Sequence, residues 1–459
     1  MSKHKRPVHH YQKLRLHITG QSHSGDGVGK VDGFTVFVPG GVQGETLLVE
    51  VTKVKSTYAH ARIVKILEES PNRVTPPCPI FDRCGGCQLQ HLSYEAQLNL
   101  KTTLVRDNLE RIGKLKDVTV HPTLGMDVPW RYRNKAQVPF GEREGGLVAG
   151  FYELGTHDII DMEACLIQHE ESDEVVRKVK DLARELGIPP YREEEHQGVL
   201  RHVVTRVGAN TDQLMIVLVT NGPHLPNKKE LVKQLNEHFP RLKSVVQNIN
   251  SERTNVIMGK ESRTLWGEDT ITDTIGDIVF VISPRSFYQV NPKQTEMLYE
   301  EALRAADLTG SETVIDAYCG IGTISLFLAQ HAHHVLGVEI VDEAIADAKR
   351  NARLNGMDNV TFAVGKAEDI MPWWYAQGVR PDVIVVDPPR KGCDERLLDT
   401  IVKMQPDRVV YVSCNPSTLA RDLRYLADRG FAVKEVQPVD MFPQTSHVEC
   451  VSQIVLKND

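Results

Sequence analysis

Residues 313–340, TVIDAYCGIGTISLFLAQHAHHVLGVEI, decide the fold of this chain. An apolar run leads into a turn that contains Gly320 and Gly322, a helical pattern follows, and a second apolar run ends at Glu339. Apolar runs of this length predict buried parallel strands, and the segment between them predicts a crossover helix. We therefore expect a strand–helix–strand unit whose first turn faces a ligand at the carboxyl edge of the sheet.

The same alternation continues toward the C-terminal end. The helical pattern VDEAIADAKRNARLNG is followed by three more apolar runs, VTFAVG, DVIVVDPPR and RVVYVSCN, and helical sequence follows the last two. Strands that alternate with helices of this length are typical of an α/β domain with a doubly wound, Rossmann-like parallel sheet. We place this domain at residues 286–459.

Two further units are expected before it. Residues 1–70 contain short alternating apolar runs punctuated by glycine, as in FTVFVPGG, which are typical of a small β-barrel. Four prolines in residues 71–79 indicate a linker. Residues 71–285 predict a central α+β domain, with a helix near residues 94–111 and strands in HVVTRVG and QLMIVLVTN.

The charge distribution separates one end of the chain from the rest. The 459 residues include 54 Lys and Arg against 61 Asp and Glu, so the net charge of -7 disfavours a general polyanion binder. The first 25 residues are nevertheless basic, with no acid before Asp26, which indicates either an arm for RNA phosphates or a solvated tail. The basic residues are Lys3, Lys5, Arg6, Lys13 and Arg15.

Sequence length and hydropathy also set expectations about location. No apolar run approaches the roughly 18 residues that a membrane span needs, and no apolar signal-peptide core follows the basic start. We therefore expect a cytoplasmic protein without a membrane partner.

Within the central unit, WRYRNKAQVPF interleaves Trp130 and Tyr132 with basic residues, a pattern that suits RNA or an amphipathic strand.

The turn after the first strand of the C-terminal unit predicts a nucleotide site. Glycines let the backbone approach a ligand, and the carboxylate of Glu339 can accept hydrogen bonds from ribose hydroxyls. The combination D-x-x-C-G-x-G-T, beginning at Asp316, and V-x-G-V-E resembles S-adenosylmethionine (SAM) binding in class I methyltransferases. SAM has no pyrophosphate, which explains why the third glycine of dinucleotide sites is not needed.

Two later strand ends indicate which atom is methylated. In DPPR, Arg390 stands where related amino-group methyltransferases have an aromatic ring, which argues against an exocyclic amine as target. Cys414, in SCNP, follows the next strand and is placed to attack an electrophile. Carbon 5 of uracil needs such help, because thiolate addition at carbon 6 creates the enolate that accepts the methyl group. We expect the site to favour the Cys414 thiolate, and Glu449 is the candidate base that removes the carbon 5 proton.

Five motifs in order resemble the RNA (uracil-5-)-methyltransferase family, in its 23S ribosomal RNA branch with an N-terminal TRAM domain. They are SFYQVNP from Ser286, DAYCGIGT, DPPRKG, SCNP and HVE, and GDGVGKVDGFTVFVPGGVQGE is similar to the TRAM pattern. The resemblance covers nearly the whole chain. It implies methylation of uridine in 23S ribosomal RNA by nucleophilic Cys414 and general base Glu449. The implied SAM contacts are Gln289, Tyr318, Glu339 and Asp387.

A cysteine cluster lies in the central unit. Cys78, Cys84 and Cys87 form C-x5-C-x2-C, and Cys165 supplies a fourth thiol. The spacing alone fits either a zinc ion or an iron–sulfur cluster. The resemblance of CGGCQLQHL and CLIQ to the family's ligands implies a structural [4Fe–4S] cluster, with zinc as the alternative. The remaining cysteines are expected to be packing residues, and they are Cys319, Cys393 and Cys450.

The sequence disfavours two other functions and leaves one alternative substrate. A radical-SAM methylthiotransferase is disfavoured, because such enzymes resemble a C-x3-C-x2-C pattern with the TRAM domain at the other end. A ribosome-assembly factor without catalytic activity is disfavoured by Cys414 and Glu449. Transfer RNA is the alternative substrate, which family members without the TRAM domain and the cysteines typically use. We expect a monomer that flips its target base toward Phe287 or Tyr288.

Overall fold

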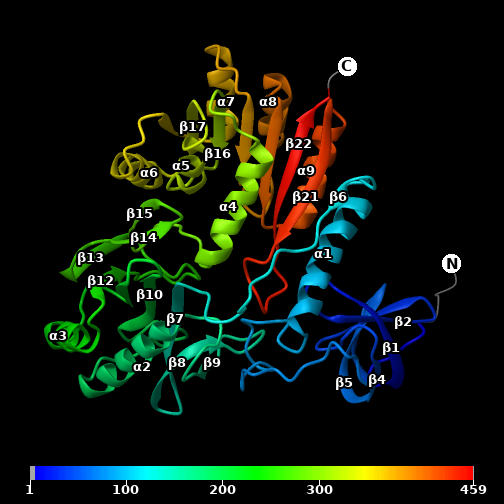
Figure 1. Cartoon of the computed structure of the whole chain (residues 1–459). Helices are drawn as coiled ribbons and strands as arrows, with labels where there is room; N and C mark the ends of the chain where they lie inside the picture. Colours follow the sequence, from blue (N-terminus) through cyan, green and yellow to red (C-terminus); the bar gives the residue numbers. More distant parts are fainter. Residues whose placement is uncertain (1–5, 458–459) are drawn as a thin grey trace.

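The computed structural model describes residues 6–457, and its first strands form a barrel (Figure 1). The strands are β1 (Lys13–Gln21), β2 (Gly27–Val31), β3 (Phe34–Val38), β4 (Thr46–Val54) and β5 (Tyr58–Glu68). They close in the order β1-β2-β3-β5-β4, which confirms the predicted small barrel. Val36 and Val38 face its core because alternate strand residues point to the same side.

The central unit is a seven-stranded sheet followed by a hairpin. The sheet strands are β7 (Lys135–Arg143), β8 (Gly146–Tyr152), β9 (Ile159–Asp161), β10 (Leu200–Gly208), β11 (Gln213–Thr220), β12 (Leu242–Ile249) and β13 (Glu261–Gly267). Their order is β13-β12-β11-β10-β7-β8-β9, and β10 and β11 confirm the two predicted strands. Helices α2 (Glu170–Glu185) and α3 (Lys228–His238) pack on it, and β14 (Ile271–Ile275) pairs with β15 (Ile278–Ile282).

The C-terminal sheet has eight strands. They are β16 (Thr313–Ala317), β17 (His334–Glu339), β18 (Val360–Val364), β19 (Val383–Val386), β20 (Arg408–Ser413), β21 (Phe431–Val439), β22 (Glu449–Leu456) and β6 (Thr119–Val120), the last from the central unit. Their order is β18-β17-β16-β19-β20-β22-β21-β6. The strands from β16 to β20 pair in parallel, whereas β22 is antiparallel to β20, so the predicted parallel sheet is confirmed.

Helices cover both faces of this sheet. One core contains residues of α4 (Pro292–Ala306), α5 (Thr323–Ala329) and α6 (Asp342–Leu354), and the other contains residues of α7 (Ala367–Ala376), α8 (Glu395–Met404) and α9 (Pro416–Ala427). Neighbouring strand residues such as Val314 and Ile315 belong to opposite cores. Among residues 6–457, no helix combines the length and apolar character that a membrane crossing needs.

Helix α1 (Tyr94–Arg111) joins the barrel to the C-terminal sheet (Figure 1). It starts where predicted, because the Ser93 hydroxyl accepts a hydrogen bond from the Ala96 amide and caps the first turn. Its first turns pack against a cluster formed by Val42, Leu89 and Leu92. Farther along, it packs against α9. The domain boundaries at residues 70 and 285 stay a prediction. Helix α1 and strand β6 lie between these boundaries in the sequence but pack against α9 and β21 of the C-terminal unit.

A buried ion pair fixes α1 to the segment after β21. Lys101 is 1% exposed, and its Nζ lies 2.5 Å from Oδ1 of Asp440. Replacing Lys101 with methionine leaves Asp440 as a buried, uncompensated charge, so we expect a loss of about 3–5 kcal/mol in the free energy of unfolding. Arg111→Met breaks the exposed pair with Asp107 on the same helix and should cost less than about 1 kcal/mol. Urea unfolding of both variants measures the difference, and equal effects would contradict it.

Candidate functional site

A cavity of about 760 Å³ lies at the carboxyl ends of β16, β17 and β19. Strand order reverses beside β16, and open α/β sheets bind ligands at this kind of crevice. All four residues predicted to contact a cofactor line the cavity, together with Cys414 and Glu449. Those four are Gln289, Tyr318, Glu339 and Asp387. The fold therefore brings together side chains that are up to 160 positions apart, from Gln289 to Glu449.

The glycine-containing turn shapes one wall of this cavity. Gly322 has φ +84°, and a Cβ there would lie 3.1–3.2 Å from atoms of Phe362 and Ala348, so both conformation and space favour glycine. The Glu339 carboxylate accepts hydrogen bonds from the amides of Gly320 at 3.3 Å and Val341 at 3.0 Å. These bonds hold Glu339 at the rim, where further lone pairs remain for a ligand's hydroxyls.

Two buried carboxyl groups line the cavity floor. Burial raises the pKa of Asp316 and of Asp387 to about 7. Oδ2 of Asp316 accepts a hydrogen bond from the Ser325 hydroxyl, whereas Oδ1 has no partner among the described residues. A buried acceptor without a partner is costly unless a ligand satisfies it. Asp316 is therefore a further candidate ligand residue, and its place at the start of the motif D-x-x-C-G-x-G-T gave no sign of the unpaired oxygen.

Cys414 and Glu449 are neighbours across two strands. Ser413, at the end of β20, pairs with Cys450 of β22, so the next antiparallel position sets Cys414 opposite Glu449. Burial, followed by the nearby Asp387 charge, raises the pKa of Glu449 well above its ordinary value, and Arg390 opposes this. A carboxyl group with a raised pKa suits proton transfer near neutral pH.

The structure contradicts the expectation that the site favours the Cys414 thiolate. Burial, then the charges of Glu449 and Asp387, raise the pKa of Cys414 to about 11, although Arg390 and a backbone hydrogen bond oppose this rise. The thiol is therefore protonated at neutral pH in the protein alone. The spacing of motifs in the sequence could not reveal this raised pKa, because the carboxyl groups of Glu449 and Asp387 come from other strands.

This pKa predicts how Cys414 reacts with iodoacetamide. The thiolate fraction should rise about tenfold per pH unit from pH 7 to pH 10, because the pKa lies above this range. Peptide-resolved mass spectrometry of the protein alone measures the alkylation rate of Cys414 at each pH. A plateau beginning near pH 7 would show a depressed pKa instead.

A second cavity reaches Cys414 from the other side. This groove of about 1170 Å³ runs between the barrel, α1 and the start of α9. Arg390, Cys414 and His447 line both the groove and the first cavity. Cys414 therefore lies where the two spaces meet. The sequence did not predict the place of His447 at this junction, because its position in the HVE motif does not show which cavity it lines.

Burial separates the two candidate stacking residues. Phe287 is 71% exposed and lines the first cavity, which leaves its ring accessible. Tyr288 is 4% exposed and packs in the core with Phe280, so its predicted stacking role is wrong. The predicted packing role of Cys393 and Cys450 agrees with their burial, and Cys319 is buried while also lining the first cavity.

The aromatic and basic segment near residue 130 is partly internal. Tyr132 is buried and donates a hydrogen bond to the Pro443 carbonyl, so it cannot stack on a base. Arg131 pairs with buried Asp173 at 2.6 Å. Arg133 and Lys135 remain partly exposed, and burial together with Arg206 and Arg133 lowers the pKa of Lys135 to about 7. The predicted basic surface is therefore reduced, because Arg131 is paired and Lys135 is only partly charged near neutral pH.

The basic start of the chain is largely part of the barrel. Lys13 and Arg15 lie in β1 and pair with Glu50 at 3.9 Å and Glu68 at 2.7 Å. These partners reduce the charge available for phosphates. Arg6 is exposed, and Lys3 and Lys5 lie outside the described residues.

The four predicted metal-ligating cysteines are free, partly buried and near one another. The charge of Cys78 adds to the burial that raises the pKa of Cys84, and the charge of Cys87 does so for Cys165. Amide groups face the sulfurs, as Gly86 does for Cys84 at 3.4 Å. Within residues 6–457, no group of three or more Cys, His, Asp or Glu is arranged to hold a metal ion.

Comparisons with known proteins define first the class and then the family. The doubly wound sheet with its cavity is the fold of a SAM-dependent methyltransferase, and residues 231–458 match the family described as tRNA (Uracil-5-)-methyltransferase. Residues 7–64 match the TRAM domain. The chain belongs to the SAM-dependent RNA (uracil-5-)-methyltransferase family.

Similar proteins span the whole chain. An RNA methyltransferase of Halalkalibacterium halodurans, described as uncharacterized, is 64% identical over 100% of both chains. One from Bacillus cereus is 56% identical over 98% of both. The tRNA (uracil-54, C5)-methyltransferase of Pyrococcus abyssi, solved with S-adenosyl-L-homocysteine, has a TM-score of 0.76 and 29% identity. That match covers 96% of this chain and 100% of the other.

Proposed function

We propose that this protein methylates carbon 5 of specific uridines in 23S ribosomal RNA. The observation that carries the proposal is the position of Cys414, opposite Glu449 and at the junction of two cavities. A nucleophile there reaches a base that enters through the groove while facing a methyl donor in the other cavity. Uracil requires this arrangement, because its carbon 5 becomes nucleophilic only after addition at carbon 6.

The chain's residues have separate roles in the proposed reaction. Cys414 gives its proton to solvent in the groove, its thiolate adds to carbon 6, and the electron pair of the 5,6 double bond moves into the enolate. SAM supplies the electrophilic methyl group that carbon 5 attacks. Glu449 then removes the carbon 5 proton, the double bond re-forms, and the Cys414 thiolate leaves. The products are 5-methyluridine and S-adenosylhomocysteine.

The first cavity suits SAM by its charge and its hydrogen-bonding groups. SAM carries an ammonium and a sulfonium, and the buried carboxyl groups of Asp316 and Asp387 favour a cation. In our proposal Glu339 binds the ribose hydroxyls, and Gln289, Tyr318 and Asp387 complete the contacts. Phe287 is the proposed stacking partner of the flipped uracil, because its ring is exposed at the cavity.

Transfer RNA is the second candidate substrate. The Pyrococcus abyssi protein, described as a tRNA methyltransferase, matches 96% of this chain, a span that must include most of the barrel and the cysteine segment. Having these parts therefore does not separate the two substrates. We favour ribosomal RNA because the sequence motifs, from SFYQVNP to HVE, resemble that branch of the family.

Methyl transfer from labelled SAM tests the proposal directly. Unmodified 23S ribosomal RNA and transfer RNA transcripts are incubated separately with the protein, and the nucleosides are then analysed. We expect label in 5-methyluridine from ribosomal RNA alone. Label from transfer RNA alone would reassign the substrate. Label in neither transcript, or in a nucleoside other than 5-methyluridine, would overturn the proposed reaction.

We also propose that Cys78, Cys84, Cys87 and Cys165 hold a structural [4Fe–4S] cluster. Four thiols are the donor set of such a cluster, and amides directed at the sulfurs of Cys84 and Cys165 would stabilise its thiolate charge, but the described side chains must turn toward a common centre to bind it. Anaerobically purified protein should be coloured and contain iron and sulfide in equal amounts. Cys87→Ser should lose both, whereas Cys393→Ser should keep them. Colourless wild-type protein with stoichiometric zinc would replace the cluster by a zinc ion.

A further inference from the structure

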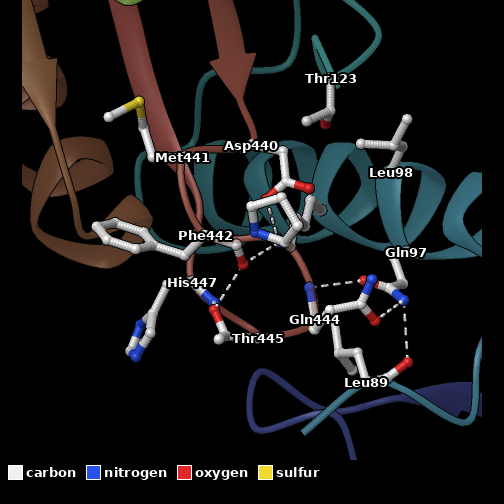
Figure 2. Close-up of polar contacts among 12 residues, drawn as sticks. Leu89, Gln97, Leu98, Thr123, Asp440, Met441, Phe442, Gln444, Thr445 and His447 are labelled. Atoms are coloured by element: carbon white, nitrogen blue, oxygen red, sulfur yellow. Dashed lines mark hydrogen bonds and ion pairs between the residues drawn. The ribbon is translucent and has the colours of Figure 1, made fainter. Parts of the chain in front are cut away.

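Figure 2 shows the segment between β21 and β22, residues 440–448, which contributes to the lining of both cavities. Phe442 and His447 line the first cavity, and His447 also lines the groove. Glu449 follows immediately as the first residue of β22. The path of residues 440–448 therefore determines where the proposed base lies relative to Cys414. We call these residues the catalytic loop.

Gln444 lies at the centre of the catalytic loop in a strained conformation. Its φ is +70°, in the left-handed region that residues other than glycine rarely adopt, and its side chain is buried. Such a conformation persists only where surrounding contacts maintain it. The sequence TSHVE after it gives no sign of this, so the reason lies in its partners.

Those partners come from two distant segments (Figure 2). The side chain of Gln97, in α1, donates a hydrogen bond to Oε1 of Gln444 at 2.9 Å. It also accepts one from the backbone N–H of Gln444 at 3.1 Å. The Gln444 carbonyl accepts hydrogen bonds from the amides of Gln88 and Leu89, each at 3.0 Å. Those two residues directly follow Cys87. The catalytic loop is thus bound both to α1 and to the cysteine segment.

Further bonds fix the beginning of the catalytic loop. Besides its ion pair with Asp440, Lys101 donates to the Phe442 carbonyl at 3.2 Å. The Tyr94 hydroxyl donates to the other oxygen of Asp440 at 2.8 Å. Both donors belong to α1, which also forms a wall of the groove. One rigid helix therefore borders the groove and holds the catalytic loop.

We propose that Gln97 and Gln444 are positioning residues that hold Glu449 in place for proton removal. This inference rests on the proposed function, because it assigns them an effect on one step of that reaction. Cys414 follows β20 and is not part of the catalytic loop, so addition and methyl transfer depend less on these contacts. Proton removal depends on the placement of Glu449, and a shift of about 1 Å in a reacting group can cost 10²-fold in rate.

Three variants test the two positioning residues. Gln97→Ala removes both hydrogen bonds between the Gln97 side chain and Gln444. Gln444→Gly removes the side chain while tolerating the positive φ. Gln405→Gly is the matched control, because Gln405 also has positive φ, at +50°, but is exposed at the end of α8. Thermal unfolding and SAM binding are measured first, and all three variants should stay folded and bind SAM within about twofold of wild type.

Single-turnover kinetics then separate the steps. Wild type and variants are mixed with labelled SAM and with the 23S ribosomal or transfer RNA transcript that wild type methylates. We expect methyl incorporation within about threefold of wild type, but release of the protein–RNA adduct slowed about 10–100-fold in Gln97→Ala and Gln444→Gly. The adduct is counted on denaturing gels. Gln405→Gly should release RNA at the wild-type rate.

The outcomes distinguish this inference from the proposed function. Unchanged adduct release in the folded Gln97→Ala and Gln444→Gly variants overturns the positioning role alone. Equal loss of incorporation and release, together with lost SAM binding, shows a role in folding and also overturns it. If wild type transfers no methyl group to uridine in either RNA, the proposed function fails and the positioning role fails with it.

Discussion

Replacing Cys414 with alanine will abolish 5-methyluridine formation, with a rate reduction of at least about 10⁴-fold. The expected effect is this large because no other step of the proposed reaction makes carbon 5 nucleophilic, and removing the nucleophile of a covalent mechanism typically costs 10⁴-fold or more. Cys414 is also the one cysteine of the described residues that lines both cavities. Methyl transfer from labelled SAM, followed by nucleoside analysis, measures the loss.

Cys393→Ala is the control for this prediction. Cys393 is a buried cysteine that lines neither cavity, so its truncation should change stability slightly and activity within about threefold. SAM binding to Cys414→Ala should remain at the wild-type level, which excludes misfolding as the cause. An alanine variant that still forms 5-methyluridine at a tenth of the wild-type rate would rule out the covalent mechanism.

Replacing Glu449 with glutamine will lower turnover by about 10²–10⁴-fold and leave the protein covalently attached to methylated RNA. A positioned general base contributes a factor of this size, and glutamine has a similar shape but accepts no proton. Because addition and methyl transfer precede proton removal, the adduct accumulates. Denaturing gels with labelled RNA and labelled SAM count the adduct and show whether it contains the methyl group.

Glu395→Gln provides the comparison for Glu449. Glu395 is an exposed first-turn residue of α8, outside both cavities, so this change should leave turnover unaltered. A Glu449→Gln variant with wild-type turnover would assign proton removal to another group. An inactive variant without any adduct would place Glu449 before methyl transfer, for example in forming the Cys414 thiolate.

Most of the fold and the members of the candidate site could be predicted from the sequence. Parallel strands share one direction, so residues at their carboxyl ends meet at one edge whatever the sequence between them. Tyr318, Glu339, Asp387 and Cys414 all follow apolar runs in this way, and the cavity brings them together. The barrel was equally readable, because the alternation of apolar residues along a strand is a local signal.

Side-chain environments could not be predicted, because they depend on elements far apart in the chain. Tyr288 and Tyr132 looked accessible in their motifs, yet both are buried by neighbouring elements. The expected Cys414 thiolate is disfavoured for the same reason, since burial and two carboxyl groups from other strands raise its pKa to about 11. A residue's spacing fixes its place on a strand but not the charges that surround it.

The catalytic loop separates most clearly what the sequence determined from what the tertiary structure determined. The sequence alone determined the parallel sheet and the barrel, and it predicted Cys414 as nucleophile and Glu449 as base, because strand ends and motifs are local patterns. Only the tertiary structure decided how Glu449 is held, because Gln444 takes its strained conformation from Gln97 and Leu89, about 350 residues earlier. Hydrogen bonds over that separation exist only after the chain has folded, since they require the barrel side of α1 to pack against the edge of the C-terminal sheet.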